Sequence, residues 1–242
     1  MEGIIIVNKP QAWTSFDVVA KIRNLTGVKK VGHSGTLDPM ATGVLPVFIG
    51  RGATKHIDQF LTGDKGYLAE MTLGVRTDTQ DAEGKEIQTE NPKIQSKSQL
   101  PTREQIQKLL PKYTGEIEQV PPMYSAVKVN GQRLYKLARQ GKEVERKPRK
   151  ITIHSLLITR YAFPHVDLEI VCSKGTYIRQ LVSDLGDDLG CGAHLSKLVR
   201  TMAHPFRLSQ ALSMDAIVTL AKVGKLDTIV IPVEDILHGH KE

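Results

Sequence analysis

A segment rich in glycine and hydroxyl residues constrains this chain most. Residues 32–43 read GHSGTLDPMATG and follow neither the period of a helix nor that of a strand. Glycine gives the backbone freedom, whereas Pro39 fixes its own φ and disfavours the α conformation at Asp38. Asp38 is therefore expected on a loop of restricted backbone, before an apolar run at 44–49. The hydroxyl, imidazole and carboxylate groups of this segment suit the close binding of a polar ligand.

Local reasoning alone leaves other interpretations open. An Asp before Pro in a glycine-rich loop is usually a turn residue that bonds its own backbone, and a lone His33 is more often structural. Lys9, at a strand end, is most simply a surface lysine. Residues 76–84 are acidic, but their spacing does not match a calcium loop, so they favour a solvated loop.

Composition narrows the class of protein. The chain has 242 residues, 40% hydrophobic residues and a net charge of +7, a modest excess that favours polyanionic partners but also fits an ordinary basic enzyme. Its two cysteines, Cys172 and Cys191, show neither metal-ligand spacing nor a disulfide framework. Without a secretory or membrane-spanning apolar stretch, the sequence predicts a soluble, cytoplasmic protein with no membrane association.

Periodicity and turn residues predict short helices among many strands. We expect strands at 3–7, 44–49, 65–75, 113–120, 125–129, 151–163 and 166–172, the last two as an antiparallel pair, and a closing strand and turn at 228–236. Helices are expected at 15–26, 53–61, 102–110, 133–140, 213–222 and from a Thr176 cap to about 189. Residues 89–101 indicate an exposed excursion within one domain, not a boundary.

The segment GHSGTLDPMATGVLP (32–46) resembles the catalytic loop of the TruB family of pseudouridine synthases. Further segments resemble other motifs of that family: 9–15, 77–84, 121–128, 174–179 and 190–201. The likeness extends to about residue 237. Ala12 departs from the pattern, because the family usually has Gly there, and the change alters the turn if φ is positive.

The resemblance implies an α+β pseudouridine synthase fold, with a large mixed, mostly antiparallel sheet flanked by helices and a central active-site cleft. It implies one catalytic domain over 1–242, without the separate C-terminal PUA-like RNA-binding domain of many relatives. The implied reaction converts uridine 55 of the tRNA TΨC loop to pseudouridine. It needs no redox cofactor, because no redox step occurs, and no metal, because no charged leaving group must be neutralised.

The resemblance also assigns residues. Asp38 is the nucleophile and Arg179 its ion-pair partner, while His33, Tyr67, Tyr177 and the backbone of Leu198 bind the nucleotide. The expected partner is the TΨC arm of tRNA, with phosphate contacts at the basic cluster 146–150 and no obligatory protein partner, so the chain is expected to be a monomer. Two alternatives stay open: a tRNA-binding RNA chaperone with dispensable catalysis, and a guide-RNA-dependent relative.

Overall fold

The computed structural model describes residues 1–87, 101–129 and 131–238. The chain falls into two compact units, which are described separately here. Unit 1 contains Met1–Tyr67 and the chain from Leu198 onward, and unit 2 contains Leu68–Lys197. The expectation of a single domain over 1–242 stays a prediction. The excursion expected at 89–101 lies outside the described residues, apart from Pro101.

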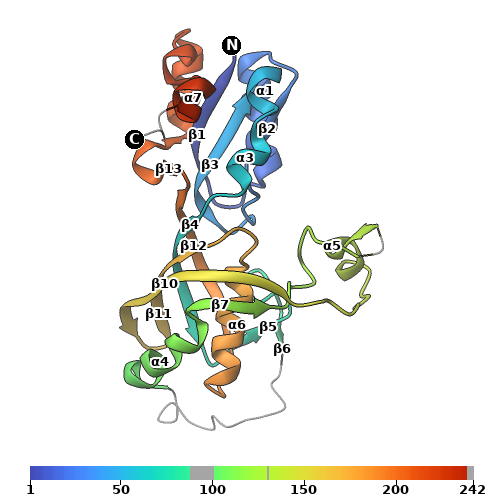
Figure 1. The fold of residues 1–242 in the computed structure, drawn as a ribbon, viewed down its shortest axis with the longest axis vertical. Coiled ribbons are helices and arrows are strands. Elements are labelled where there is room, and N and C mark those ends of the chain that lie inside the picture. Colours follow the sequence, from blue (N-terminus) through green and yellow to red (C-terminus); the bar gives the residue numbers. More distant parts are fainter. Residues whose placement is uncertain (88–100, 130, 239–242) are drawn as a thin grey trace. The chain divides into compact units, whose positions relative to one another are not determined.

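Strands dominate the described chain (Figure 1). They are β1 (Gly3–Lys9), β2 (Val31–His33), β3 (Thr42–Ile49), β4 (Lys65–Leu73), β5 (Arg76–Thr77), β6 (Glu86–Ile87), β7 (Gly115–Gln119), β8 (Lys128–Val129), β9 (Gln132–Arg133), β10 (Arg149–Ala162), β11 (His165–Cys172), β12 (Ala193–Ala203), β13 (Phe206–Arg207) and β14 (Leu212–Ser213). The helices are α1 (Ser15–Thr26), α2 (Arg51–Thr54), α3 (Ile57–Leu61), α4 (Arg103–Leu109), α5 (Leu134–Ala138), α6 (Ile178–Asp188), α7 (Met214–Lys222) and α8 (Val233–His238).

Hydrogen bonding orders the main strands as β14-β1-β3-β12-β4-β11-β10-β7, with β2 beside β3 and β13 beside β12. The pairs β1/β14 and β3/β12 are parallel, whereas β1/β3, β10/β11 and β10/β7 are antiparallel. The expected α+β class, with a large, mixed and mostly antiparallel sheet flanked by helices, is therefore confirmed.

In unit 1, helices cover both faces of β1 and β3. Alternate residues of a strand point to opposite faces, so Ile5 and Val7 enter one core and Ile4 and Ile6 the other. The first core takes the apolar side of α1 together with Met214 and Ile217 of α7. The second takes residues of α2, α3, β13 and α8. Both faces are buried, which explains the continuous apolar run at residues 3–7.

Helix α1 shows why local sequence defines its ends. Thr14 accepts a hydrogen bond from the Asp17 N–H, and the Asp17 carboxylate accepts one from the Thr14 N–H, which forms a capping box. Gly27 closes the helix with a left-handed φ of 67°. The helix predicted to begin after a cap at Thr14 or Ser15 and to run to about Thr26 is confirmed, with Thr14 as the cap.

In unit 2, β4, β11, β10 and β7 follow one another in the sheet, and α6 packs its apolar side into the core. The hairpin β8–β9 and helix α5 lie out to the side of that sheet (Figure 1). This basic arm leads back into β10 through residues 146–150.

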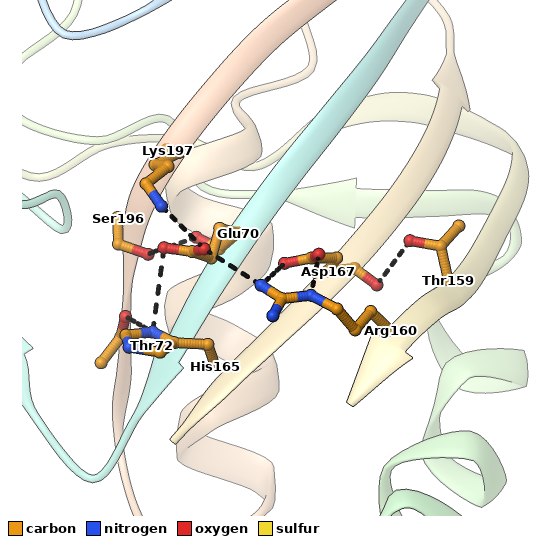
Figure 2. A network of polar contacts seen from close by, with 8 residues as sticks. All are labelled: Glu70, Thr72, Thr159, Arg160, His165, Asp167, Ser196 and Lys197. Carbon is orange, nitrogen blue, oxygen red and sulfur yellow. Dashed lines mark hydrogen bonds and ion pairs between the residues drawn. The ribbon is translucent and has the colours of Figure 1, made fainter. Parts of the chain in front are cut away.

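A buried carboxylate joins the sheet strands of unit 2 (Figure 2). Glu70 on β4 accepts hydrogen bonds from Ser196 (2.8 Å) and Lys197 (3.0 Å) of β12. Arg160 of β10 and His165 of β11 lie 3.5 and 3.8 Å from the same carboxylate. Burial alone raises the pKa of Glu70, but the hydrogen bonds from Lys197 and Ser196 outweigh it, so its pKa lies below the ordinary value.

Several predicted elements differ from the structure. The helix predicted at 53–61 is two short helices, α2 and α3, and the strand predicted at 125–129 keeps only Lys128–Val129. The strand and turn predicted at 228–236 are wrong as a strand: a 3-10 turn at Leu226–Ile229 precedes helix α8, and an isolated bridge joins Ile231 to Ile4. No helix within the described ranges is both long and apolar enough to cross a membrane.

Candidate active site

The loop that carries Asp38 joins β2 to β3 in unit 1, and buried groups fix its backbone on both sides of Asp38. The Ser15 hydroxyl accepts a hydrogen bond from the Leu37 N–H (2.9 Å) and donates to the Leu37 carbonyl (3.2 Å). On the other side, the Lys9 amine donates to the Pro39 carbonyl (3.1 Å). The Asp38 side chain is half-buried. Its position therefore depends on two residues that precede it in sequence by more than twenty positions.

Lys9 is completely buried, so its interpretation as a surface lysine is wrong. Its amine also donates to the carbonyls of Pro10 and Trp13. Ala12, in the turn between them, has a left-handed φ of 66°, and its N–H donates to the Pro39 carbonyl at 2.9 Å. The positive φ expected to make the Gly-to-Ala change matter is present, and the turn sits directly against the catalytic-loop segment.

Arg200 on β12 is a second buried cation of unit 1, and the sequence reasoning missed it. Its side chain is 1% exposed and donates to the carbonyls of Val44 (2.7 Å) and Gly35 (3.0 Å). Burial lowers the pKa of Arg200, and a hydrogen bond with Tyr67 opposes that shift. Arg200 thus ties Tyr67 of β4 to the start of the Asp38 loop. Its position two residues after Leu198, in a motif already noted, was the available signal.

The loop ends at Gly43, where the backbone packs closely against β12. Gly43 has a φ of 104° and pairs with Arg200 where β3 runs parallel to β12. A Cβ at this position would lie 2.2 Å from the Arg200 carbonyl oxygen. Only glycine lets the end of the loop approach β12 this closely.

His33 ends β2, just before the loop. Burial, and then the positive charge of Arg200, lower the pKa of His33 below its ordinary value, so the ring is neutral at neutral pH. Within the described residues, its buried Nδ1 has no hydrogen-bond partner. A neutral ring can stack on a base without the cost of burying a charge.

The remaining predicted nucleotide contacts of unit 1 are buried on neighbouring strands. Tyr67 is 9% exposed on β4, and Leu198 is 6% exposed on β12. Four of the predicted site residues thus belong to unit 1: Asp38, His33, Tyr67 and Leu198.

Unit 2 contains the other two predicted residues, Tyr177 and Arg179, at the start of α6. Arg179 is 5% exposed, so its charge is buried. Its guanidinium donates to the carbonyls of Thr79 (3.1 Å) and Tyr124 (2.9 Å). Because Asp38 belongs to the other unit, the expected Asp38–Arg179 ion pair stays a prediction.

Asp81 is a charged partner of Arg179 within unit 2, at 3.6 Å. Its carboxylate also accepts hydrogen bonds from the Thr79 hydroxyl (2.5 Å) and the Glu83 N–H (3.1 Å). Asp81 is 3% exposed, so the interpretation of residues 76–84 as a solvated loop is wrong at this position. Within the described ranges, no three His, Cys, Asp or Glu side chains lie together as a metal site.

Tyr177, and not Thr176, is the N-cap residue of α6. The Thr176 hydroxyl donates back to the Ser173 carbonyl (3.0 Å), so the predicted cap is wrong. The side chain of Gln119 bonds both backbone groups of Tyr177 instead, at 2.8 and 3.0 Å. Sequence reasoning missed Gln119 because it lies 58 positions away from Tyr177.

Comparison with known proteins places this chain among enzymes that make pseudouridine. Residues 23–178 match the TruB family pseudouridylate synthase (N terminal domain), and residues 179–238 match the tRNA pseudouridylate synthase B C-terminal domain. The tRNA pseudouridine synthase B of Protochlamydia amoebophila is 51% identical over 213 residues, which are 88% of this chain and 78% of that protein. That of Clostridium kluyveri is 45% identical over 242 residues, 100% of this chain and 80% of that protein.

Among solved structures, the chain resembles one in the crystal structure of a Cbf5-Nop10-Gar1 complex. The TM-score is 0.74 at 28% identity, and the match covers 97% of this chain but 61% of that one. The fold is thus shared with a longer protein of lower identity. The two family domains together span residues 23–238, and with the identities to the curated relatives they show that this chain belongs to the TruB family of pseudouridylate synthases.

Proposed function

We propose that this chain converts uridine 55 in the TΨC loop of tRNA to pseudouridine, with Asp38 as the nucleophile. The observation that carries the proposal is the backbone of the Asp38 loop, which Ser15 and Lys9 fix on both sides of Asp38. A carboxylate held in advance loses little freedom when it meets the ribose, and this favours reaction. The curated relatives are named tRNA pseudouridine synthase B, which supports tRNA as the substrate.

The reaction rearranges bonds without a change of oxidation state. The N1–C1′ bond breaks, the uracil turns, and C5 bonds to C1′ with loss of the C5 proton, while N1 gains a proton. Asp38 serves this sequence either by adding covalently or by stabilising and deprotonating a sugar-centred intermediate. Both routes require an ionised carboxylate beside the ribose.

The target base is stacked inside a folded loop, so it must be turned outward before it reaches Asp38. An extruded uracil needs an aromatic face and hydrogen bonds at its edge. We assign stacking, and removal of the C5 proton, to Tyr67, which is buried and interacts with the buried Arg200. His33 stacks on the nucleotides left behind, and Tyr177 and the Leu198 backbone contact the flipped nucleotide.

Basic residues supply the affinity for the phosphates of the tRNA arm. Lys147, Arg149 and Lys150 are exposed where the basic arm joins β10. Arg146 is ion-paired with Glu143 and Lys150 with Glu116, at 3.1 and 2.9 Å, and the exposed side chain of Lys150 can exchange that carboxylate for a phosphate. We assign phosphate contacts to the exposed three. The logarithm of affinity then falls in proportion to the logarithm of salt concentration, by about 0.7 to 0.9 for each contact. A salt-independent affinity would contradict this footprint.

We propose that the chain acts without guide RNA or protein partners. The solved relative in the Cbf5-Nop10-Gar1 complex assembles with other proteins, but its identity to this chain is 28%, against 45% and 51% for the curated tRNA enzymes. Purified chain mixed with tRNA alone tests this. Activity only after addition of a cell extract would contradict it.

The decisive experiment measures tritium release from a tRNA transcript labelled at uridine C5. Wild-type protein should release label from one TΨC-loop position, and Asp38→Asn should release none. Asp58→Asn makes the same chemical change at an exposed position of α3 and should leave the rate unchanged. Release by Asp38→Asn would mean that another residue is the nucleophile. Silence of the wild type with tRNA still bound would favour the chaperone alternative.

A further inference from the structure

A buried glutamine side chain holds the backbone of Tyr177. Gln119 is the last residue of β7 and is 4% exposed. Its Nε2 donates to the Tyr177 carbonyl at 3.0 Å, and its Oε1 accepts from the Tyr177 N–H at 2.8 Å. One carboxamide thus pairs both backbone groups of a single residue, as a neighbouring strand would.

This contact takes the place of a helix cap. Tyr177 has an extended backbone (φ −101°, ψ 107°), and no side chain caps α6 through the usual N-cap bond. Its carbonyl also accepts the Leu181 N–H at 3.0 Å, so both of its lone pairs are used. Gln119 therefore sets the direction in which Tyr177 leads into the helix.

The segment that carries Gln119 also holds Arg179. Five residues after Gln119, the Tyr124 carbonyl accepts a hydrogen bond from the Arg179 guanidinium. Pro121 and Pro122 lie buried between these two contacts, and each proline fixes its own φ. One stiff segment, 119–124, thus contacts both residues of α6 that the family motif assigns to the active site.

We infer that Gln119 is a positioning residue for uridine isomerisation, acting through Tyr177 and the first turn of α6. The inference rests on the roles proposed above for Tyr177 and Arg179. The position requires a side chain with a donor at one end and an acceptor at the other, which a carboxamide provides at neutral pH. A side chain with only acceptors leaves the Tyr177 carbonyl facing a second oxygen, and an apolar one leaves a buried N–H unpaired.

Gln119→Leu removes both hydrogen bonds to Tyr177 and replaces the side chain with one of similar size. Its kcat for a tRNA transcript should fall about 10- to 100-fold, as expected when a reacting group is misplaced by about 1 Å. Its KM should change by less than about threefold, because the phosphate contacts stay intact. Tritium release measured over a range of transcript concentrations separates the two constants.

Gln119→Glu tests whether the side chain must donate a hydrogen bond, because a change of pH switches that donor on or off in the same variant. The ionised carboxylate cannot donate to the Tyr177 carbonyl, whereas the protonated acid donates and accepts as the amide does. Burial against a carbonyl raises the pKa of such a carboxyl group. The ratio of variant to wild-type kcat should therefore rise about tenfold or more between about pH 8 and pH 5.5. For Gln119→Leu the same ratio should be independent of pH.

Gln107→Glu makes the same substitution at an exposed position of α4 and should leave both kcat and its pH profile unchanged. A pH-independent ratio for Gln119→Glu, or a wild-type kcat for Gln119→Leu, would overturn the inference. Loss of the native circular dichroism spectrum in both Gln119 variants would also overturn it, because Gln119 would then serve folding alone.

Separate variants distinguish this inference from the proposed function. Activity of Asp38→Asn would refute the proposed nucleophile, whatever Gln119 does. A wild-type rate for Tyr177→Ala would refute the role of Tyr177 and the inference with it. A slow Tyr177→Ala beside a fast Gln119→Leu would refute only the role of Gln119.

Discussion

Replacing Ala12 with glycine should stabilise the protein, although it removes a methyl group. Ala12 has a φ of 66°, a left-handed conformation that costs a residue with a Cβ about 1–2 kcal/mol. Glycine avoids that cost but gains conformational freedom in the unfolded chain, which costs about 0.4–1 kcal/mol. The side chain is exposed, so little apolar burial is lost. The net effect of Ala12→Gly is an increase of about 0.5–1 kcal/mol in the free energy of unfolding.

The assay can observe this turn directly. Trp13 is the single tryptophan of the chain and directly follows Ala12. Its fluorescence during urea unfolding reports on unit 1, and the midpoint should rise while the slope m stays unchanged. Ala20→Gly, inside α1, makes the same chemical change where φ is helical, and it should lower stability by about 1 kcal/mol.

Opposite signs for Ala12→Gly and Ala20→Gly are therefore expected. A lower midpoint for Ala12→Gly would refute the reasoning, because it would mean that the left-handed turn at Ala12 carries no strain. Activity measured beside stability would then tell whether the strained turn, whose N–H bonds the Pro39 carbonyl, contributes to holding the loop.

Three further changes test other parts of the structure. Lys9→Met removes the buried amine that donates to three backbone carbonyls, so it should lower the free energy of unfolding by about 2 kcal/mol or more. It should also slow tritium release at least about tenfold, because the Asp38 loop loses a support. Unchanged urea unfolding and activity curves would contradict this. Glu70→Gln removes a carboxylate whose folded pKa is depressed, and such a group stabilises above its unfolded pKa and loses that effect as pH falls through its folded pKa. The variant should be less stable at pH 7 and should lose less stability than wild type between about pH 5 and pH 3, as followed by circular dichroism; parallel acid curves would argue against the network. Gly43→Ala should lower the free energy of unfolding by about 3 kcal/mol or more, because the new Cβ would lie 2.2 Å from a backbone oxygen. Gly27 also has a positive φ but has open space around it, so Gly27→Ala should lower it by only about 1 kcal/mol in the same urea experiment.

The local sequence alone determined the elements whose ends are set by near neighbours. Thr14 and Asp17 define the start of α1, and Gly27 defines its end, because a capping box and a left-handed glycine need only residues within one turn. Thr102 starts α4 by the same capping box with Gln105. The antiparallel pair at 151–172 was also predicted correctly, since its strands are adjacent in sequence.

Tertiary structure decided the rest, because the deciding partners are far away in sequence. The segment at 228–236 has apolar residues that suit a strand. Its second half instead begins α8, because Val233, Ile236 and Leu237 pack into a core with β1 and β3. Nothing in a window of ten residues shows that Lys9 will be buried against the Pro39 carbonyl.

The candidate site also has a part that the sequence predicted and a part that only the tertiary structure revealed. The motifs gave the candidate groups, Asp38 among them, because the proposed reaction restricts which residue types can serve. The groups that hold those residues in place were hidden from the sequence: Arg200 reaches Gly35 across 165 positions, and Gln119 reaches Tyr177 across 58. Hydrogen bonds of a buried side chain to distant carbonyls leave no periodic pattern, so only the folded chain reveals them.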